Sequence, residues 1–157
     1  MNLITFSLFG DNPLYCQGAV ENANLARVIY PEWTARFYVA QDVPEDYIKE
    51  IEDYGAEVVR CEKKNSYDGL NWRFRPLSSL KVHYWISRDA DSRLSWRERN
   101  AVDEWMESDK AAHLLRDCHN HGFTIMAGMF GINNKLFHER YGVLNLDNAN
   151  ANYREAD

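Results

Sequence analysis

Two aspartates separated by one small residue form the strongest chemical signal in this sequence. Asp89 and Asp91 lie in the run Arg-Asp-Ala-Asp-Ser-Arg, which directly follows an apolar stretch. Both carboxylates can therefore turn toward one hard divalent cation, and such oxygen ligands suit Mg²⁺ or Mn²⁺. That cation would neutralise a leaving diphosphate, while Arg88 and Arg93 would add positive charge suited to phosphate oxygens. The alternative interpretation is a charge-balanced surface turn that leads into a helix.

The elements that must position this pair alternate short apolar runs with amphipathic stretches, which is typical of an α/β domain. Strands are predicted at 3–9, 35–40, 56–61, 82–87, 111–116 and 125–130. Helices are predicted at 18–30, 44–54 and 96–108. Ser95 and Glu98 form a capping box that begins the third helix. The polar segment 62–76 predicts a long loop.

This order predicts an α/β fold with a mainly parallel, twisted sheet flanked by helices. A single domain is expected over residues 1–144, followed by a polar, Asn-rich C-terminal tail at 145–157. In sheets of this kind, ligands bind beyond the carboxyl ends of the strands. We therefore expect the site to be built from the loops at 10–15, 71–76 and 88–93.

The composition narrows the class of protein. The chain has 157 residues, of which 45% are hydrophobic and 27% charged, as in an ordinary globular domain. A net charge of −6 argues against nonspecific binding to nucleic acid or to an anionic membrane. No apolar run approaches the roughly 20 residues of a membrane span, and the N-terminus lacks the basic start of a signal peptide. Three widely spaced cysteines predict reduced thiols and a cytoplasmic location.

Several motifs, in a fixed order, resemble a family of bacterial and viral glycosyltransferases with the GT-A fold. The resemblance covers roughly residues 3–133 and begins with the twelve residues from Tyr15, Tyr-Cys-Gln-Gly-Ala-Val-Glu-Asn-Ala-Asn-Leu-Ala. It continues with Ile29-Tyr-Pro-Glu-Trp, Arg36-Phe-Tyr-Val, Trp72-Arg-Phe, Arg88-Asp-Ala-Asp-Ser-Arg-Leu, Ala101-Val-Asp-Glu-Trp, Arg116-Asp and Gly128-Met-Phe-Gly. The resemblance implies one Rossmann-like domain that binds a nucleotide-diphosphate sugar with a divalent metal.

The same resemblance implies roles for the Asp-x-Asp segment. Asp91 would be the direct ligand of Mn²⁺ or Mg²⁺, while Asp89 would face the ribose or a metal-bound water. Ala90, between them, and Arg88, just before them, would belong to the same nucleotide-sugar-binding segment.

Residues from the other two loops would complete the donor site by resemblance. Phe9 and Gly10 would border the base and the ribose, and Arg73 would reach toward the diphosphate. On the residues alone, Arg73 could instead stack on Trp72 or Phe74.

Two features later in the chain have open interpretations. Asp117 follows a predicted strand and could act as a general base toward an acceptor hydroxyl, or could cap a loop or helix. Asp117 also lies near Cys118, His119, His121 and His113, which are residue types that bind zinc. The sequence has no Cys-x-x-Cys pair to complete such a site.

The turn at 128–131 has two glycines, Gly128 and Gly131. They would let a sugar approach closely, or would simply form a β-turn.

The sequence thus predicts a metal-dependent glycosyltransferase that moves a sugar from a nucleotide-diphosphate sugar to a carbohydrate or glycoconjugate hydroxyl. Two alternatives remain. One is a phosphatase of the haloacid dehalogenase type, with Lys110 or Lys135 as its lysine, and the other is a noncatalytic nucleotide-sugar-binding module.

The resemblance also implies a late metal ligand, for which only His138 is available. We therefore expect the chain to bind its donor but to transfer sugar slowly, unless a partner such as a second copy completes the site.

Overall fold

The computed structural model describes residues 1–63, 67–116 and 125–144, and the strands within these ranges form one sheet. The order across the sheet is β3-β2-β1-β4-β6-β5. Strands β1 to β4 run parallel, whereas β6 is antiparallel to both of its neighbours. The strands are β1 (Asn2–Leu8), β2 (Thr34–Ala40), β3 (Glu57–Cys61), β4 (Tyr84–Arg88), β5 (Ala112–Leu114) and β6 (Met129–Asn133). The prediction of a mainly parallel α/β sheet is confirmed.

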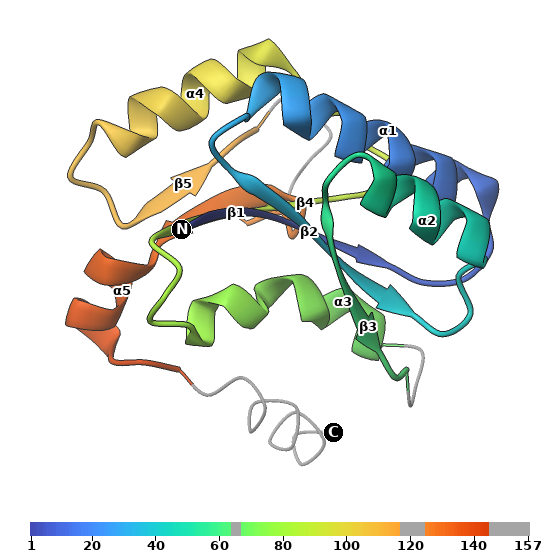
Figure 1. Cartoon of the computed structure of the whole chain (residues 1–157). Coiled ribbons are helices and arrows are strands. Elements are labelled where there is room, and N and C mark those ends of the chain that lie inside the picture. The colour runs from blue at the N-terminus through green and yellow to red at the C-terminus, as the bar shows by residue number, and fades with distance from the viewer. Residues whose placement is uncertain (64–66, 117–124, 145–157) are drawn as a thin grey trace.

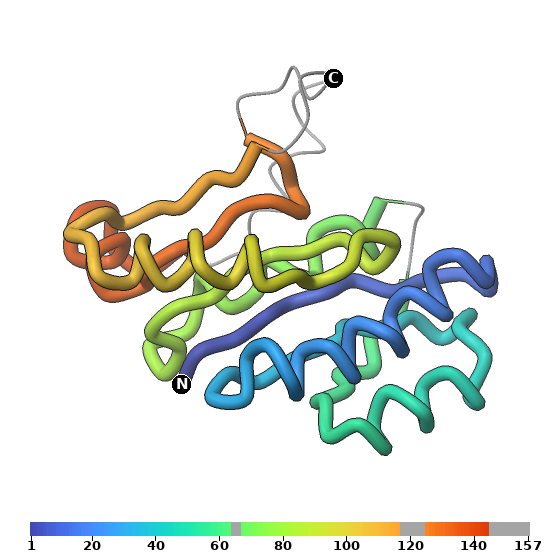
Figure 2. Tube along the Cα trace, turned by 90° about the horizontal axis from the view of Figure 1, so that it is seen from above, coloured from blue at the N-terminus to red at the C-terminus, as the bar shows by residue number. Residues whose placement is uncertain are grey.

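Helices cover both faces of the sheet (Figure 1). One face carries α1 (Pro13–Ile29), α2 (Glu45–Asp53) and α4 (Trp96–Met106), which lie side by side in Figure 2. The other face carries α3 (Asp68–Asn71), the 3₁₀ helix η1 (Trp72–Ser78) and α5 (Asn134–Tyr141). Within the residues described, none of the helices has the length and apolar character that crossing a bilayer requires.

The prediction of a long loop at 62–76 is wrong over most of that segment, because α3 and η1 lie there. Two polar side chains of β1 hold η1 on the sheet. The Thr5 hydroxyl donates to the Arg73 carbonyl (2.9 Å), and the Ser7 hydroxyl accepts from the Arg73 amide (3.2 Å). The segment is too short and too polar to show helical periodicity, so its structure depends on these long-range hydrogen bonds.

Two helix boundaries also differ from the prediction. Helix α1 begins at Pro13, earlier than expected, because the Asn12 side chain accepts a hydrogen bond from the Leu14 amide and caps it. Helix α5 was not predicted, and Asn133 caps it in the same way.

Residues of β4 alternate between two hydrophobic clusters. Ile86 faces the larger cluster, under α1, α2 and α4, where Phe6 and Phe37 stack at 4.5 Å. Trp85 faces the smaller cluster, with Phe74 of η1. This alternation follows from the two-residue repeat of a strand, and it sets which side each residue of β4 faces.

His113 on β5 is buried under α4, where its ring stacks on Trp105 at 5.3 Å. Its Nε2 has no hydrogen-bond partner among the described residues. Burial, and to a smaller extent the positive charge of Arg88, lower the pKa of His113 to about 4. The ring is therefore neutral in the folded protein at neutral pH.

We predict that this burial makes the protein less stable in acid. The unfolded chain protonates His113 near its ordinary pKa of about 6.5, whereas the folded chain resists protonation until about pH 4. The stabilisation is complete above pH 6.5 and is lost as the pH falls toward 4. Urea unfolding at pH 7.5 and pH 5 should show a loss of about 2 kcal/mol that disappears in His113→Phe. The control variant His83→Asn, at an exposed histidine, should show the same loss as the parent protein. If His113→Phe also showed that loss, the acid sensitivity would belong to other groups.

Candidate functional site

Beyond the carboxyl ends of β1 and β4 lies a cavity of about 370 Å³, here called the Asp-x-Asp cavity. Each of the three loops expected from the sequence contributes to its wall. The lining residues are Ser7, Leu8, Phe9, Asn12, Tyr15, Leu70, Arg73, Asp89, Ala90 and Asp91. The fold therefore brings Phe9, Arg73 and the Asp-x-Asp segment together.

Asp89 is held on two sides. Its carboxylate forms an ion pair with Nη1 of Arg73, which also donates to the Arg88 carbonyl at 3.2 Å. On the other side, a Cβ at Gly128 would lie 2.0 Å from Oδ2 of Asp89. Because Gly128 has no side chain, it leaves room for the carboxylate of Asp89. Arg73 is buried and its guanidinium also lies 5.7 Å from the Phe74 ring, so the stacking expected from the sequence and the ion pair coexist.

Asp91 differs from Asp89 in having an exposed side chain. In the part of the chain that the structure describes, no hydrogen bond or ion pair is formed by its carboxylate. A carboxylate that is uncompensated and lines a cavity is well suited to bind a cation.

Helix α1 fixes the backbone of the Asp-x-Asp loop. The buried Asn22 donates from Nδ2 to the carbonyls of Ala90 (3.2 Å) and Ser92 (2.7 Å), and its Oδ1 accepts from the Leu94 amide (3.1 Å). One turn earlier, Gly18 lets the helix approach so closely that a Cβ there would lie 2.2 Å from the Ala90 oxygen. Sequence reasoning missed both residues, although both stand in the twelve-residue motif that begins at Tyr15.

The loop after β1 is held by the end of β2. Gly10 has a φ of 77°, and its amide donates to Oδ1 of Asp42 at 2.8 Å. This hydrogen bond, together with Lys63 at 3.2 Å, holds the pKa of Asp42 below its usual value. Phe9 lines the Asp-x-Asp cavity and its ring centre lies 5.2 Å from Nζ of Lys63, whereas Gly10 does not line the cavity.

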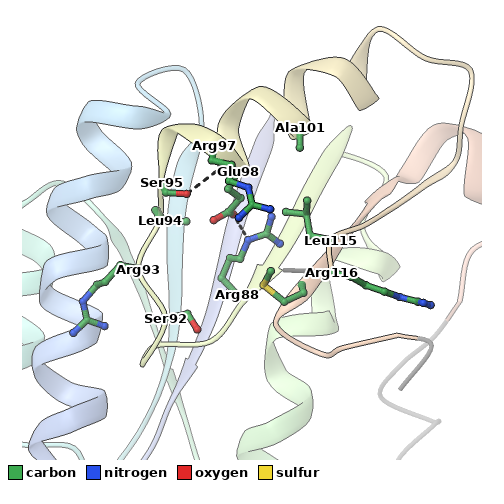
Figure 3. A pocket seen from close by; sticks show the side chains of 11 residues that line it. Arg88, Ser92, Arg93, Leu94, Ser95, Arg97, Glu98, Ala101, Leu115 and Arg116 are labelled. Carbon is green, nitrogen blue, oxygen red and sulfur yellow. Dashed lines mark hydrogen bonds and ion pairs between the residues drawn. The ribbon is translucent and has the colours of Figure 1, made fainter. Parts of the chain in front are cut away.

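Arg88 lies on the opposite side of the strand from Asp89. Its side chain points toward α4 and forms an ion pair with Glu98 (Figure 3). Asp89, the first residue after β4, pairs with Arg73 and lines the Asp-x-Asp cavity, so the two neighbouring side chains lie in different cavities. The guanidinium of Arg88 lines a second cavity instead, together with Arg93.

Other residues singled out from the sequence lie elsewhere. Asp117 and the residues after it, to 124, are outside the described residues. His138 on α5 contacts the Leu77 carbonyl at 2.6 Å and does not line the Asp-x-Asp cavity. The same holds for Lys110 and Lys135.

No protein-family model matches this sequence, and no curated protein matches it either. Solved structures do match. A mannosyltransferase from Pyrobaculum calidifontis, PcManGT, in complex with GDP-Man and Mn²⁺, superposes with a TM-score of 0.56 at 10% identity, over 92% of this chain. Galactosyltransferase LgtC, with donor and acceptor sugar analogues, gives 0.51 at 13% identity, over 92% of this chain and 66% of its own.

This is the GT-A fold. A 4-diphosphocytidyl-2C-methyl-D-erythritol synthase from Anaerococcus prevotii also matches, with a TM-score of 0.50 at 12% identity, over 89% of this chain and 75% of its own. The chain spans 48% of PcManGT, about half of that protein. The likeness confirms the predicted Rossmann-like GT-A architecture, and the activity follows from the site rather than from the fold.

We predict that Gly18→Ala destabilises the protein although alanine favours helices. The added methyl would collide with the Ala90 carbonyl, a backbone atom that Asn22 holds in place. Overpacking of this kind outweighs the helix propensity gained, so the free energy of unfolding should fall by about 1–2 kcal/mol. Urea denaturation measures the change. The control is Gln17→Ala, the same new residue at an exposed neighbouring position of α1. If Gly18→Ala were as stable as Gln17→Ala, close packing at Gly18 would be contradicted.

A second prediction concerns the ion pair between Arg73 and Asp89. Arg73→Gln should lower the free energy of unfolding by about 1–2 kcal/mol, because Asp89 loses its partner but still reaches water. Lys49→Gln, which removes an exposed positive charge on α2 that has no hydrogen bond or ion pair among the described residues, should alter it by less than about 0.5 kcal/mol. Thermal and urea unfolding of both variants provide the comparison, and equal effects would show that the pair does not stabilise the site.

Proposed function

We propose that this chain binds a nucleotide-diphosphate sugar in the Asp-x-Asp cavity and transfers the sugar to a hydroxyl of a carbohydrate or glycoconjugate. The observation that carries the proposal is Asp91, an exposed carboxylate without a partner among the described residues, beside the positioned Asp89. Both lie at the carboxyl edge of a GT-A sheet. The structures of PcManGT with GDP-Man and of LgtC with donor and acceptor sugar analogues support the same class of substrate.

The donor set of the cavity fits a divalent cation that is shared with the substrate. Among the described residues, no group of three or more His, Cys, Asp or Glu side chains could hold a metal. Mg²⁺ and Mn²⁺ are commonly bound by one or two carboxylates, with phosphate oxygens and water completing the shell. We assign Asp91 as the direct ligand and Asp89 as its neighbour toward the ribose or a bound water. When present, the cation supplies charge neutralisation for the leaving diphosphate.

The chain's own groups would bind and orient the donor. Asn12 and Tyr15 place the amino end of α1 on the cavity, where the helix dipole favours phosphate. Phe9 and Tyr15 offer aromatic faces to the base or the sugar. Arg73 would act on the diphosphate chiefly through Asp89, because Nη1 is engaged there.

Asp117 remains our proposal for the general base toward the acceptor hydroxyl. It lies outside the described residues, so the assignment rests on its place after the fifth predicted strand.

The alternatives are less well supported. A phosphatase of the haloacid dehalogenase type needs a lysine at the carboxylates, but Lys110 pairs with Asp109 and Lys135 lies on α5. A noncatalytic donor-binding module would share the cavity but form no product. Incubation with donor, Mn²⁺ and a panel of acceptors, followed by mass spectrometry, separates these outcomes: a glycosylated acceptor supports transfer, and donor binding without any product supports the module.

We predict that donor affinity depends on Asp91 and on the cation together. Calorimetry with the tightest binder from a panel of nucleotide-diphosphate sugars should show a loss of at least about thirtyfold in Asp91→Asn, or in EDTA. The loss arises because the diphosphate would then face the cavity without a counter-charge. Asp53→Asn, an exposed carboxylate at the end of α2, should bind like the parent. Equal affinity with EDTA and with Mn²⁺ would refute the metal bridge.

A further inference from the structure

On the other face of the Asp-x-Asp loop lies a cavity of about 290 Å³ between α4 and the ends of β4 and β5, here called the arginine cavity (Figure 3). The two cavities meet at Asp89–Arg93, since Asp89 to Asp91 line one and Ser92 and Arg93 line the other. Four arginines and one carboxylate line the arginine cavity, although the whole chain carries a net charge of −6. These residues are Arg88, Arg93, Arg97, Arg116 and Glu98.

Arg88 provides a buried positive charge with unused hydrogen-bonding capacity. Its side chain is 2% exposed, and it binds Glu98 through Nε and the Ser87 and Phe130 carbonyls through Nη1. Nη2 has no partner among the described residues, although burial of an unpaired guanidinium N–H is costly. Figure 3 shows this group reaching from β4 into the cavity, beside Leu115.

The amino end of α4 opens onto the same space. The Ser95 hydroxyl accepts from the Glu98 amide, and the Ser95 carbonyl receives the Arg99 amide. The amides of the two residues between, Trp96 and Arg97, precede the first intrahelical bond and so have no helical acceptor. With the dipole of an eleven-residue helix behind them, they favour a negative group at this end.

Arg97 supplies an exposed positive charge to the arginine cavity. It is exposed, and no hydrogen bond or ion pair of its side chain occurs among the described residues. Arg93, in contrast, is paired with Glu21, and the Glu98 carboxylate is neutralised by Arg88. A ligand would therefore meet Arg97 and Nη2 of Arg88 from two sides.

We propose that the arginine cavity binds an oxyanion of the acceptor, a phosphate or a carboxylate. The inference rests on the proposed function, because it assigns the bound group to the molecule that receives the sugar. The geometry supports this assignment. Ser92 and Arg93, which line the arginine cavity, directly follow Asp91, which lines the Asp-x-Asp cavity. Arg88 and Asp89 lie between the charge of the arginine cavity and the proposed donor. The acceptor class would then be anionic glycans or phosphate-bearing glycoconjugates.

The test measures anion binding directly, without donor, metal or turnover. The full chain, labelled with ¹⁵N, is titrated with inorganic phosphate, and separately with acetate, at constant ionic strength. We expect saturable shifts of the Trp96 and Arg97 amides and of the Nε–H of Arg88. In Arg97→Gln the affinity should fall about tenfold, because a charge-assisted hydrogen bond is lost. Arg140→Gln, the same change on exposed α5, should bind like the parent.

Each result of these titrations has one meaning. A response to phosphate alone supports a phosphate group on the acceptor, and a response to acetate as well shows that a carboxylate is sufficient for binding. Absence of saturable shifts with either anion, or equal affinity in Arg97→Gln and the parent, would overturn the proposal. Failure to bind any nucleotide sugar would refute the proposed function while leaving these titrations interpretable, so the two failures are distinguishable.

Discussion

The ion pair between Arg73 and Asp89 is the contact on which the geometry of the site depends. It joins two side chains 16 residues apart in sequence and closes η1 against the end of β4. Thr5 and Ser7 in turn hold the backbone of Arg73, so the first strand, η1 and the Asp-x-Asp loop form one connected unit. Without this pair a partly buried guanidinium and a carboxylate would each lose their compensation, and the shared wall of the cavity would lose its constraint.

The alternation of side chains along β4 explains why one short loop borders two cavities of opposite character. Trp85 and Ile86 face different clusters, and the same repeat sends Arg88 toward α4. Asp89, the first residue after the strand, turns toward η1. Acidic and basic groups that are neighbours in sequence are therefore separated by the sheet. Because these charges are kept apart, a cation and an oxyanion could bind on either side of the same loop.

The sequence predicted the first four strands well because they are apolar runs whose burial dominates their energetics. The last strand was placed too early, at 125–130, whereas β6 spans Met129–Asn133. The sequence also predicted the three loops of the site, since ligands of parallel sheets bind at one edge. It could not predict α3 and η1, whose structure depends on Thr5 and Ser7 rather than on their own periodicity. The supporting roles of Gly18 and Asn22 were hidden for the same reason, because only the folded chain brings α1 against the loop at 90–94.

Arg88 lies apart from the Asp-x-Asp cavity because its side chain turns toward α4. As a residue beside Asp89 it suited a phosphate, but the two-residue repeat carries it to the opposite face. The predicted strand ended at residue 87, so the direction of Arg88 and its pairing with Glu98 followed only from the folded chain.

The charged residues of the Asp-x-Asp loop are paired unevenly, and this unevenness locates the cation site. Arg88 is compensated by Glu98, Asp89 by Arg73 and Arg93 by Glu21. Of the four charges in this loop, the carboxylate of Asp91 alone has no partner within the described residues. Because Asn22 also fixes the backbone on both sides of Asp91, a cation would meet a ligand whose main chain is already in place. The loop therefore combines a rigid backbone with one uncompensated charge, which is the arrangement that favours binding of a metal shared with a diphosphate.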